Sequence, residues 1–115
     1  MRQKVQSLAQ LRRQYAQGCR ALSRLGYLSQ GSVQDRTGRL GGGAGYQWTR
    51  KVAGKTVTVA LTAGQYARMK EAVGNYRKLR RQLASLERLS RRIIFETVPH
   101  TGRRKYLSQK ALGLK

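Results

Sequence analysis

The chain has 115 residues, of which 25 are Lys or Arg and only four are Asp or Glu, so its formal net charge is +21. Self-repulsion of this size opposes a compact fold unless an anionic partner compensates for it, and nucleic acid is the polyanion best suited to do so. The length predicts one small domain with short tails. The sequence contains no run of about 18 apolar residues, so a transmembrane helix is not expected.

Residues 2–25 are predicted to form the first helix. Apolar residues recur there at spacings of three and four, which places them on one stripe of a helix; they are Val5, Leu8, Leu11, Tyr15, Cys19, Leu22 and Leu25. Gly26 follows the last of them and is a natural helix stop. The other faces carry Arg12, Arg13, Arg20 and Arg24.

Residues 26–45 lack periodicity and are predicted to form a mobile basic loop. Glycines are concentrated between Gly38 and Gly45, and such a segment holds neither a helix nor a central strand. The loop lacks the Gly-Lys-Ser/Thr ending of a phosphate-binding P-loop. We expect Arg36 and Arg39 to contact phosphates if the loop enters a nucleic-acid groove, and the alternative is a flexible linker.

Residues 46–61 are predicted to form a β-hairpin, because two runs rich in β-branched and aromatic residues alternate with period two. Ala53 disfavours a type I′ turn, so we expect a type I turn with Gly54 in the left-handed region and a bulge. The apolar face formed by Val57, Val59 and Leu61 is expected to lie on one end of the helical pair.

The tip of this hairpin is a candidate nucleic-acid contact. A two-stranded ribbon fits the major groove of B-DNA, and Arg50, Lys51 and Lys55 flank the expected turn. Two roles are open for Trp48: it can stack on an unpaired base, or it can be a core residue that holds the hairpin on the helices.

Residues 63–95 are predicted to form a long second helix. Thr62 and Gln65 have the spacing of a capping box, and Pro99 ends the pattern. Its apolar stripe contains Tyr66, Met69, Val73, Tyr76, Leu79, Leu83, Leu86, Leu89 and Ile93. Because both helices carry such a stripe, we expect antiparallel pairing. The predicted class is α+β, with residues 1–96 as a single small domain and 97–115 as a basic tail.

The second helix also carries the largest set of candidate phosphate contacts. Spacings of four, seven and four place Arg77, Arg81, Arg88 and Arg92 on one helical face. A merely solvated face would interleave Glu with Lys, but here only Glu87 interrupts the cations. Further candidates are Lys78, Arg80 and Arg91 on the helix and Arg103, Arg104 and Lys105 in the tail.

The sequence offers little for catalysis or for metal binding. The four acidic residues are scattered singly, so no carboxylate pair suggests acid–base or metal-dependent chemistry. Cys19 and His100 cannot supply the four ligands of a structural zinc site, and Cys19 is expected to be buried with its apolar stripe. We therefore expect no enzyme, no cofactor and no metal.

One cysteine fits a reducing cytoplasm, where we expect association with the nucleoid or a ribonucleoprotein.

Several stretches resemble a known family. They are residues 31–36, 61–65 and 75–79, and above all the string Tyr46-Gln47-Trp48-Thr49-Arg50-Lys51-Val52-Ala53-Gly54-Lys55-Thr56. Residues 22–94 thereby resemble small uncharacterised bacterial proteins that are often found beside transposases. The resemblance implies a mobile-element or ribonucleoprotein setting and no reaction. Family members carry a Cys- and His-rich insert where residues 37–44 hold neither residue type, so any metal role is expected to be lost.

The function expected from these observations is nucleic-acid binding without catalysis, as an accessory or architectural subunit of an RNA–protein or transposon-type complex. Structured RNA is slightly favoured over duplex DNA. The alternative is a protein–protein module in which the apolar stripe from Tyr66 to Ile93 forms a homodimer or binds a partner helix, and the charge gives solubility. Membrane binding is not expected, because the apolar faces carry few large aromatic residues.

Overall fold

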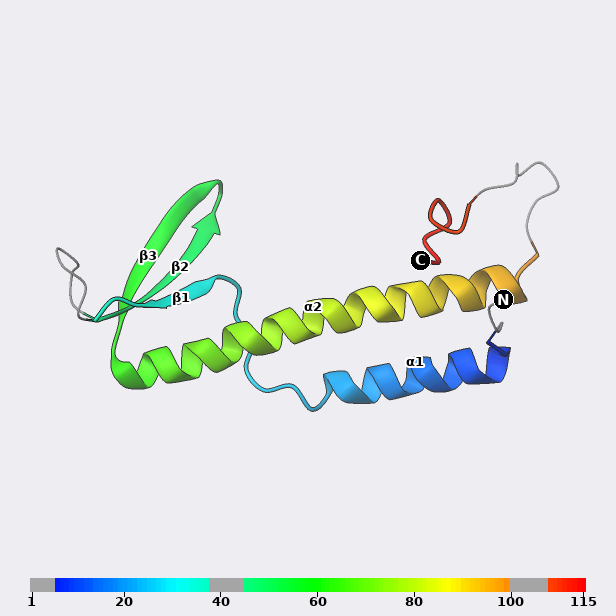
Figure 1. The fold of residues 1–115 in the computed structure, drawn as a ribbon, viewed down its shortest axis with the longest axis horizontal. Helices are drawn as coiled ribbons and strands as arrows, with labels where there is room; N and C mark the ends of the chain where they lie inside the picture. The colour runs from blue at the N-terminus through cyan, green and yellow to red at the C-terminus, as the bar shows by residue number, and fades with distance from the viewer. Residues whose placement is uncertain (1–5, 38–44, 100–107) are drawn as a thin grey trace, which may run out of the picture. The chain divides into compact units, whose positions relative to one another are not determined.

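The computed structural model describes residues 6–37, 45–99 and 108–115, which form two helices and a three-stranded antiparallel sheet (Figure 1). The predicted α+β class is confirmed. In chain order the elements are α1 (Leu8–Leu22), β1 (Ser32–Asp35), β2 (Tyr46–Val52), β3 (Lys55–Leu61) and α2 (Ala63–Thr97). The chain divides into a helical unit, Met1–Arg24 with Arg80–Lys115, and a sheet unit, Leu25–Leu79.

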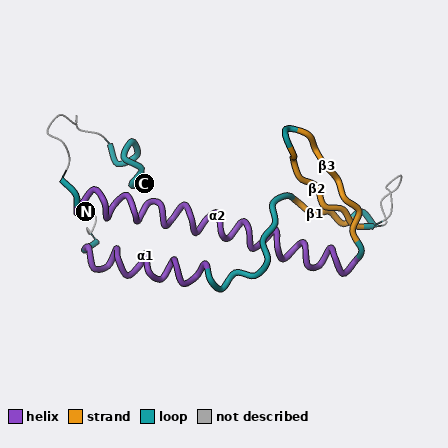
Figure 2. Tube along the Cα trace, turned by 180° about the vertical axis from the view of Figure 1, so that it is seen from behind, coloured by secondary structure: helices purple, strands orange, loops and turns teal. Residues whose placement is uncertain are grey.

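The helical unit pairs α1 with the C-terminal half of α2, and the two helices run antiparallel as expected (Figure 2). A capping box starts α1: the backbone N–H of Gln10 donates to Ser7 Oγ at 3.1 Å, and the N–H of Ser7 donates to Gln10 Oε1 at 2.9 Å. The prediction that this helix begins at residue 2 is therefore wrong, because the cap at Ser7 fixes its start. The helix ends at Leu22, capped by Ser23, and not at the predicted Leu25.

The core of the helical unit is small and closely packed. Leu11 on α1 is 3% exposed and Leu86 on α2 is 8% exposed. Gly18 is buried where the helices approach, since a Cβ at this position would lie 2.6 Å from both Leu86 Cδ2 and Gln82 Nε2. The absence of a side chain at Gly18 therefore allows the two helices to pack at short range.

The chain end returns to α2 in the helical unit. Residues 108–115 contain a helical turn in which the N–H of Leu112 donates to the carbonyl of Ser108 at 3.1 Å. Arg91 Nη1 donates to the carbonyl of Gly113 at 3.2 Å, and Arg92 Nε donates to that of Leu114 at 3.1 Å. The last residues of the predicted tail thus have local structure and bind α2.

The sheet unit has the strand order β1-β2-β3, and its first strand corrects the prediction of a loop over residues 26–45. β1 contains a single β-branched residue, Val33, which is too little for a strand pattern. It forms because β2 offers a free edge, on which Val33 pairs with Trp48. The glycine-rich stretch 38–44 of the predicted loop lies outside the described residues.

The predicted hairpin is present, but its predicted turn is wrong. Val52 pairs with Lys55, which leaves a two-residue connection. Ala53 has φ of 50° and Gly54 has φ of 80°, and positive φ at both positions is the requirement of a type I′ turn. This turn matches the right-handed twist of the strands, so strand pairing offsets the strain of an alanine in the left-handed region.

The first half of α2 covers only the base of the hairpin. Thr62 and Gln65 form the predicted capping box, with distances of 3.0 and 3.1 Å. Beside it the rings of Tyr46 and Tyr66 stack with centroids 4.5 Å apart. Val57 and Val59 stay 37% and 39% exposed, so the expectation that their face is covered by the helices is wrong. Among the described residues of this unit, Ala72 and Val73 are buried.

Candidate nucleic-acid interface

Three arginines of α2 form an unpaired basic face on the helical unit. Arg80, Arg81 and Arg88 are exposed, and their guanidinium groups have no hydrogen bond or ion pair with any part of the chain that the structure describes. Arg81 and Arg88 lie two turns apart on one side of the helix, about 10 Å along its axis. Cations in this state can bind phosphates without first breaking an internal interaction.

Two other predicted arginines are already engaged. Besides its bond to Gly113, Arg91 forms an ion pair with Glu87 at 3.1 Å. Arg92 also donates to Gln6 Oε1 at 3.4 Å. Both residues are half-buried. They bind Gln6, Gly113 and Leu114 to α2, a role that their spacing on the helix did not indicate.

A second set of exposed arginines, on α1 and directly after it, was not among the predicted contacts. Arg13, Arg20 and Arg24 are exposed. The spacing of seven residues places Arg13 and Arg20 on one side of the helix, away from the buried Leu11 and Gly18, and Arg24 lies in the turn directly after the helix. The same spacing rule that selected residues of α2 would have found this face.

The predicted basic residues of the sheet unit occur in two places. Arg77 and Lys78 are exposed on α2, and Arg50, Lys51 and Lys55 are exposed near the hairpin tip. Because side chains alternate along a strand, the register places Arg50 and Lys55 on one face of the hairpin and Lys51 on the other. The hairpin therefore presents cations on both faces.

Trp48 serves the packing of the sheet unit. It is half-buried, and its indole N–H donates to the carbonyl of Gln30 at 2.9 Å. The guanidinium carbon of Arg50 lies 4.4 Å from the ring centroid. Gly31, with φ of 108°, allows the close approach, since a Cβ there would lie 2.6 Å from Trp48 Nε1. The indole thus links β2 to the segment before β1.

Arg36 lies at the base of the glycine-rich segment, half-buried. Its backbone N–H donates to the carbonyl of Gly45 at 2.8 Å, while its buried Nε has no partner in the described ranges. The adjacent Asp35 accepts from the N–H of Thr37 at 2.9 Å, which closes a local turn. The other predicted contacts, Arg39, Arg103, Arg104 and Lys105, lie outside the described residues.

An open groove of about 480 Å³ lies between the helices of the helical unit. It is lined by Tyr15, Cys19, Leu22, Leu83, Leu86, Glu87, Ser90 and Arg91. Cys19 is exposed, so its expected burial is wrong. The hydrogen bond between Tyr15 and Cys19 raises the pKa of Tyr15, with smaller contributions from the charge of Cys19 and from desolvation.

Residues suited to metal binding do not come together in the described ranges, where no group of three or more His, Cys, Asp or Glu side chains occurs. The glutamates Glu71 and Glu87 form ion pairs on α2 with Arg68 and Arg91. Neither described helix has the length and apolar character that crossing a membrane requires.

Comparisons with known proteins found no counterpart of the chain. No family model matches it, and no curated protein or solved structure shows a significant match. The resemblance to small bacterial proteins found beside transposases therefore stays a prediction.

Proposed function

We propose that the protein is a non-enzymatic nucleic-acid-binding subunit, accessory or architectural, of an RNA–protein or transposon-type complex. The observation that supports this proposal most is the set of exposed arginines of the helical unit: Arg13 and Arg20 on α1, Arg24 in the turn after it, and Arg80, Arg81 and Arg88 on α2. Phosphate groups that meet such side chains release condensed counterions, which makes binding favourable and dependent on salt.

The hairpin of the sheet unit is proposed to add contacts in a groove or a loop. Val52 is 44% exposed, and Arg50, Lys51 and Lys55 are exposed around it. A ribbon with cations on both faces can contact two phosphate backbones that border one groove. Structured RNA is slightly favoured as the ligand, because widened grooves and loops admit such a ribbon. A nucleoid or ribonucleoprotein location in the cytoplasm follows from this proposal.

Fluorescence anisotropy tests the proposal with a labelled RNA stem-loop and a DNA duplex, titrated over a range of potassium chloride. We expect a linear decrease of log K with log salt concentration. The variant Arg80→Gln, Arg81→Gln, Arg88→Gln should reduce the slope on the duplex by about two to three, at about 0.9 for each lost contact. The corresponding variant of Arg13, Arg20 and Arg24 tests the face of α1 separately.

The matched control replaces the same three α2 residues by lysine, which keeps the charge and the exposure. This control should keep the salt slope of the wild type, since counterion release depends on charge. A glutamine variant with the wild-type slope would exclude the α2 face from the interface. A wild-type protein that binds neither ligand at low salt would refute the proposed function.

The alternative, a protein–protein module, is favoured by the groove of the helical unit. Tyr15 and Leu83 on its walls are 40% and 42% exposed, and such a groove can accept an apolar helix. A stable homodimer after nuclease treatment, detected by light scattering, would support this alternative. A monomer under these conditions is the result expected from the proposed function.

A further inference from the structure

Tyr27 is the most exposed of the large hydrophobic side chains that the structure describes, at 87% exposed. Its backbone is nevertheless fixed, because Asn75 Nδ2 donates to the carbonyl of Tyr27 at 3.1 Å. Two residues later, the N–H of Ser29 donates to the carbonyl of Ala72 at 3.2 Å. A rigid backbone thus presents an aromatic ring to solvent, where it contributes little to the fold.

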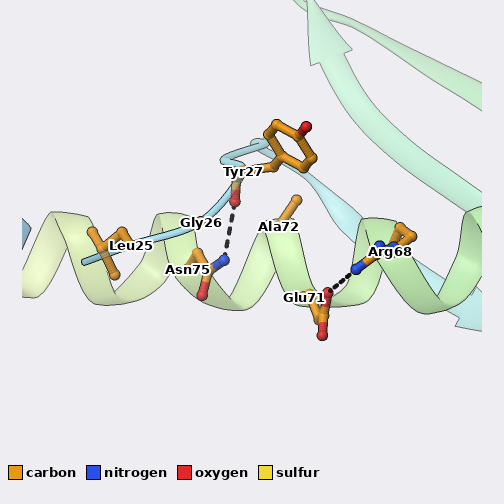
Figure 3. A pocket seen from close by; sticks show the side chains of 7 residues that line it. All are labelled: Leu25, Gly26, Tyr27, Arg68, Glu71, Ala72 and Asn75. Carbon is orange, nitrogen blue, oxygen red and sulfur yellow. Dashed lines mark hydrogen bonds and ion pairs between the residues drawn. The ribbon is translucent and has the colours of Figure 1, made fainter. Parts of the chain in front are cut away.

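The ring stands at the edge of an open pocket of about 470 Å³ within the sheet unit. In Figure 3 the Tyr27 side chain projects from the loop above Ala72, and Arg68 lies further along α2. The pocket is lined by Leu25, Gly26, Tyr27, Arg68, Glu71, Ala72 and Asn75. This volume is in the range of small-molecule sites, and its walls combine apolar surface with a few polar groups.

Arg68 gives the pocket a cation that a ligand can use. Its Nη1 lies 3.4 Å from Glu71 Oε2, and the two side chains are 79% and 68% exposed. An ion pair this exposed is weak, so the guanidinium can exchange Glu71 for a phosphate at little cost. An aromatic ring and an available arginine that line one pocket are a combination that can bind an unpaired nucleotide, by stacking on its base and by charge on its phosphate.

Trp48, the aromatic residue that the sequence suggested for stacking, is less suited to this role. Its indole N–H is bound to Gln30, and Arg50 lies over its ring. An incoming base would have to displace Arg50 to reach that face. Tyr27 requires no such displacement, since neither an aromatic stacking partner nor a cation over its ring occurs in the described ranges.

We propose that the Tyr27 pocket binds one unpaired nucleobase of the nucleic acid, with the ring of Tyr27 as the stacking surface and Arg68 on the adjacent phosphate. This inference rests on the proposed function and deepens it. The phosphate contacts of the helices are independent of base pairing, whereas this pocket recognises a base that is free of its partner strand. The ligand is then RNA with a loop or bulge, in preference to a continuous duplex.

The test uses the full chain, an RNA stem-loop with 2-aminopurine at one loop position, and a fully paired RNA duplex of equal phosphate number. Tyr27→Leu should weaken stem-loop binding by about 5- to 160-fold, the range of one stacked base, and leave duplex binding unchanged. The 2-aminopurine fluorescence should be quenched by the wild-type protein and not by this variant. Tyr27→Phe keeps the ring and should restore both affinity and quenching.

Tyr15→Leu is the matched control, because Tyr15 is a partly exposed tyrosine of the helical unit. It should keep the preference for the stem-loop. Circular dichroism should show wild-type helix content for Tyr27→Leu, as the ring is almost fully exposed. Arg68→Gln should reduce stem-loop affinity more than duplex affinity.

The outcomes separate this inference from the proposed function. If the wild type binds both RNAs with a salt-dependent slope and Tyr27→Leu binds the stem-loop equally well, the pocket proposal is overturned and the proposed function stands. The pocket proposal is also overturned if Tyr27→Leu weakens both RNAs equally. If the wild type binds neither RNA, the proposed function itself fails.

Discussion

At the scale of single residues, the positive φ of Ala53 is imposed by the pairing of the two strands that it connects, and not by the conformational preference of alanine. An L-residue in the left-handed region is unfavourable by about 1 kcal/mol or more. The seven-residue strands on either side nevertheless leave only Ala53 and Gly54 to connect them. The turn type could not be predicted because the exact strand register, set by pairing over the whole hairpin, decides it.

Ala53→Asn should therefore stabilise the protein, since asparagine tolerates positive φ and Asn-Gly is the preferred type I′ pair. We expect a gain of about 0.5–1 kcal/mol, measured by urea denaturation. Ala53→Val is the opposing control, because a β-branched residue is strongly disfavoured at positive φ. A valine variant as stable as the wild type would contradict the type I′ turn.

At the scale of elements, the two helices and the hairpin were predictable because their patterns are long. The start of α2 was also predictable, because Thr62 and Gln65 satisfy its first N–H groups locally. β1 was not, because four residues with one apolar side chain form a strand only beside β2. Among the candidate sites, the exposure of Arg77, Arg81 and Arg88 agrees with their helical spacing. The hydrogen bonds of Arg91 to Gly113 and of Arg92 to Leu114 and Gln6 depend instead on residues distant in sequence.

Substitutions of two helix glycines should change the stability of the protein in opposite directions, and they test how the helices pack. Gly74 on α2 has no atom within 4 Å of an added Cβ, so Gly74→Ala should stabilise the protein by about 1 kcal/mol through helix propensity. Gly18→Leu should destabilise it by about 1–3 kcal/mol, because the new side chain must displace Leu86 and Gln82. Thermal unfolding of both variants measures the difference. Wild-type stability of Gly18→Leu would show that α1 does not pack on α2 through this residue.

At the scale of the whole molecule, charge opposes folding more than in an ordinary domain. The net charge is +21, while few of the described side chains are buried: Leu11 and Leu86 in the helical unit, Ala72 and Val73 in the sheet unit. A core of this size provides little free energy of unfolding with which to oppose self-repulsion. Stability is therefore expected to depend on ions, and under the proposed function also on a nucleic acid that binds the folded state.

Raising the salt concentration should increase the melting temperature, since screening weakens repulsion between exposed cations. A gain of about 1 kcal/mol corresponds to roughly 4 °C or more for a domain of this size. Differential scanning calorimetry at low and high potassium chloride measures the shift, and under the proposed function an excess of RNA at low salt should also raise the melting temperature. A melting temperature that falls with added salt would contradict this account.

The sequence by itself determined the charge, the two helices, the hairpin and the helical faces on which most candidate cations lie. Each of these features depends on composition or on the periodic spacing of residues that are close together in the sequence. Only the tertiary structure decided that β1 pairs with β2, that Trp48 is bound to Gln30, that the C-terminal residues engage Arg91 and Arg92, and that Tyr27 is left exposed. The physical reason is that these contacts join residues far apart in sequence, so their occurrence depends on where the fold places both partners.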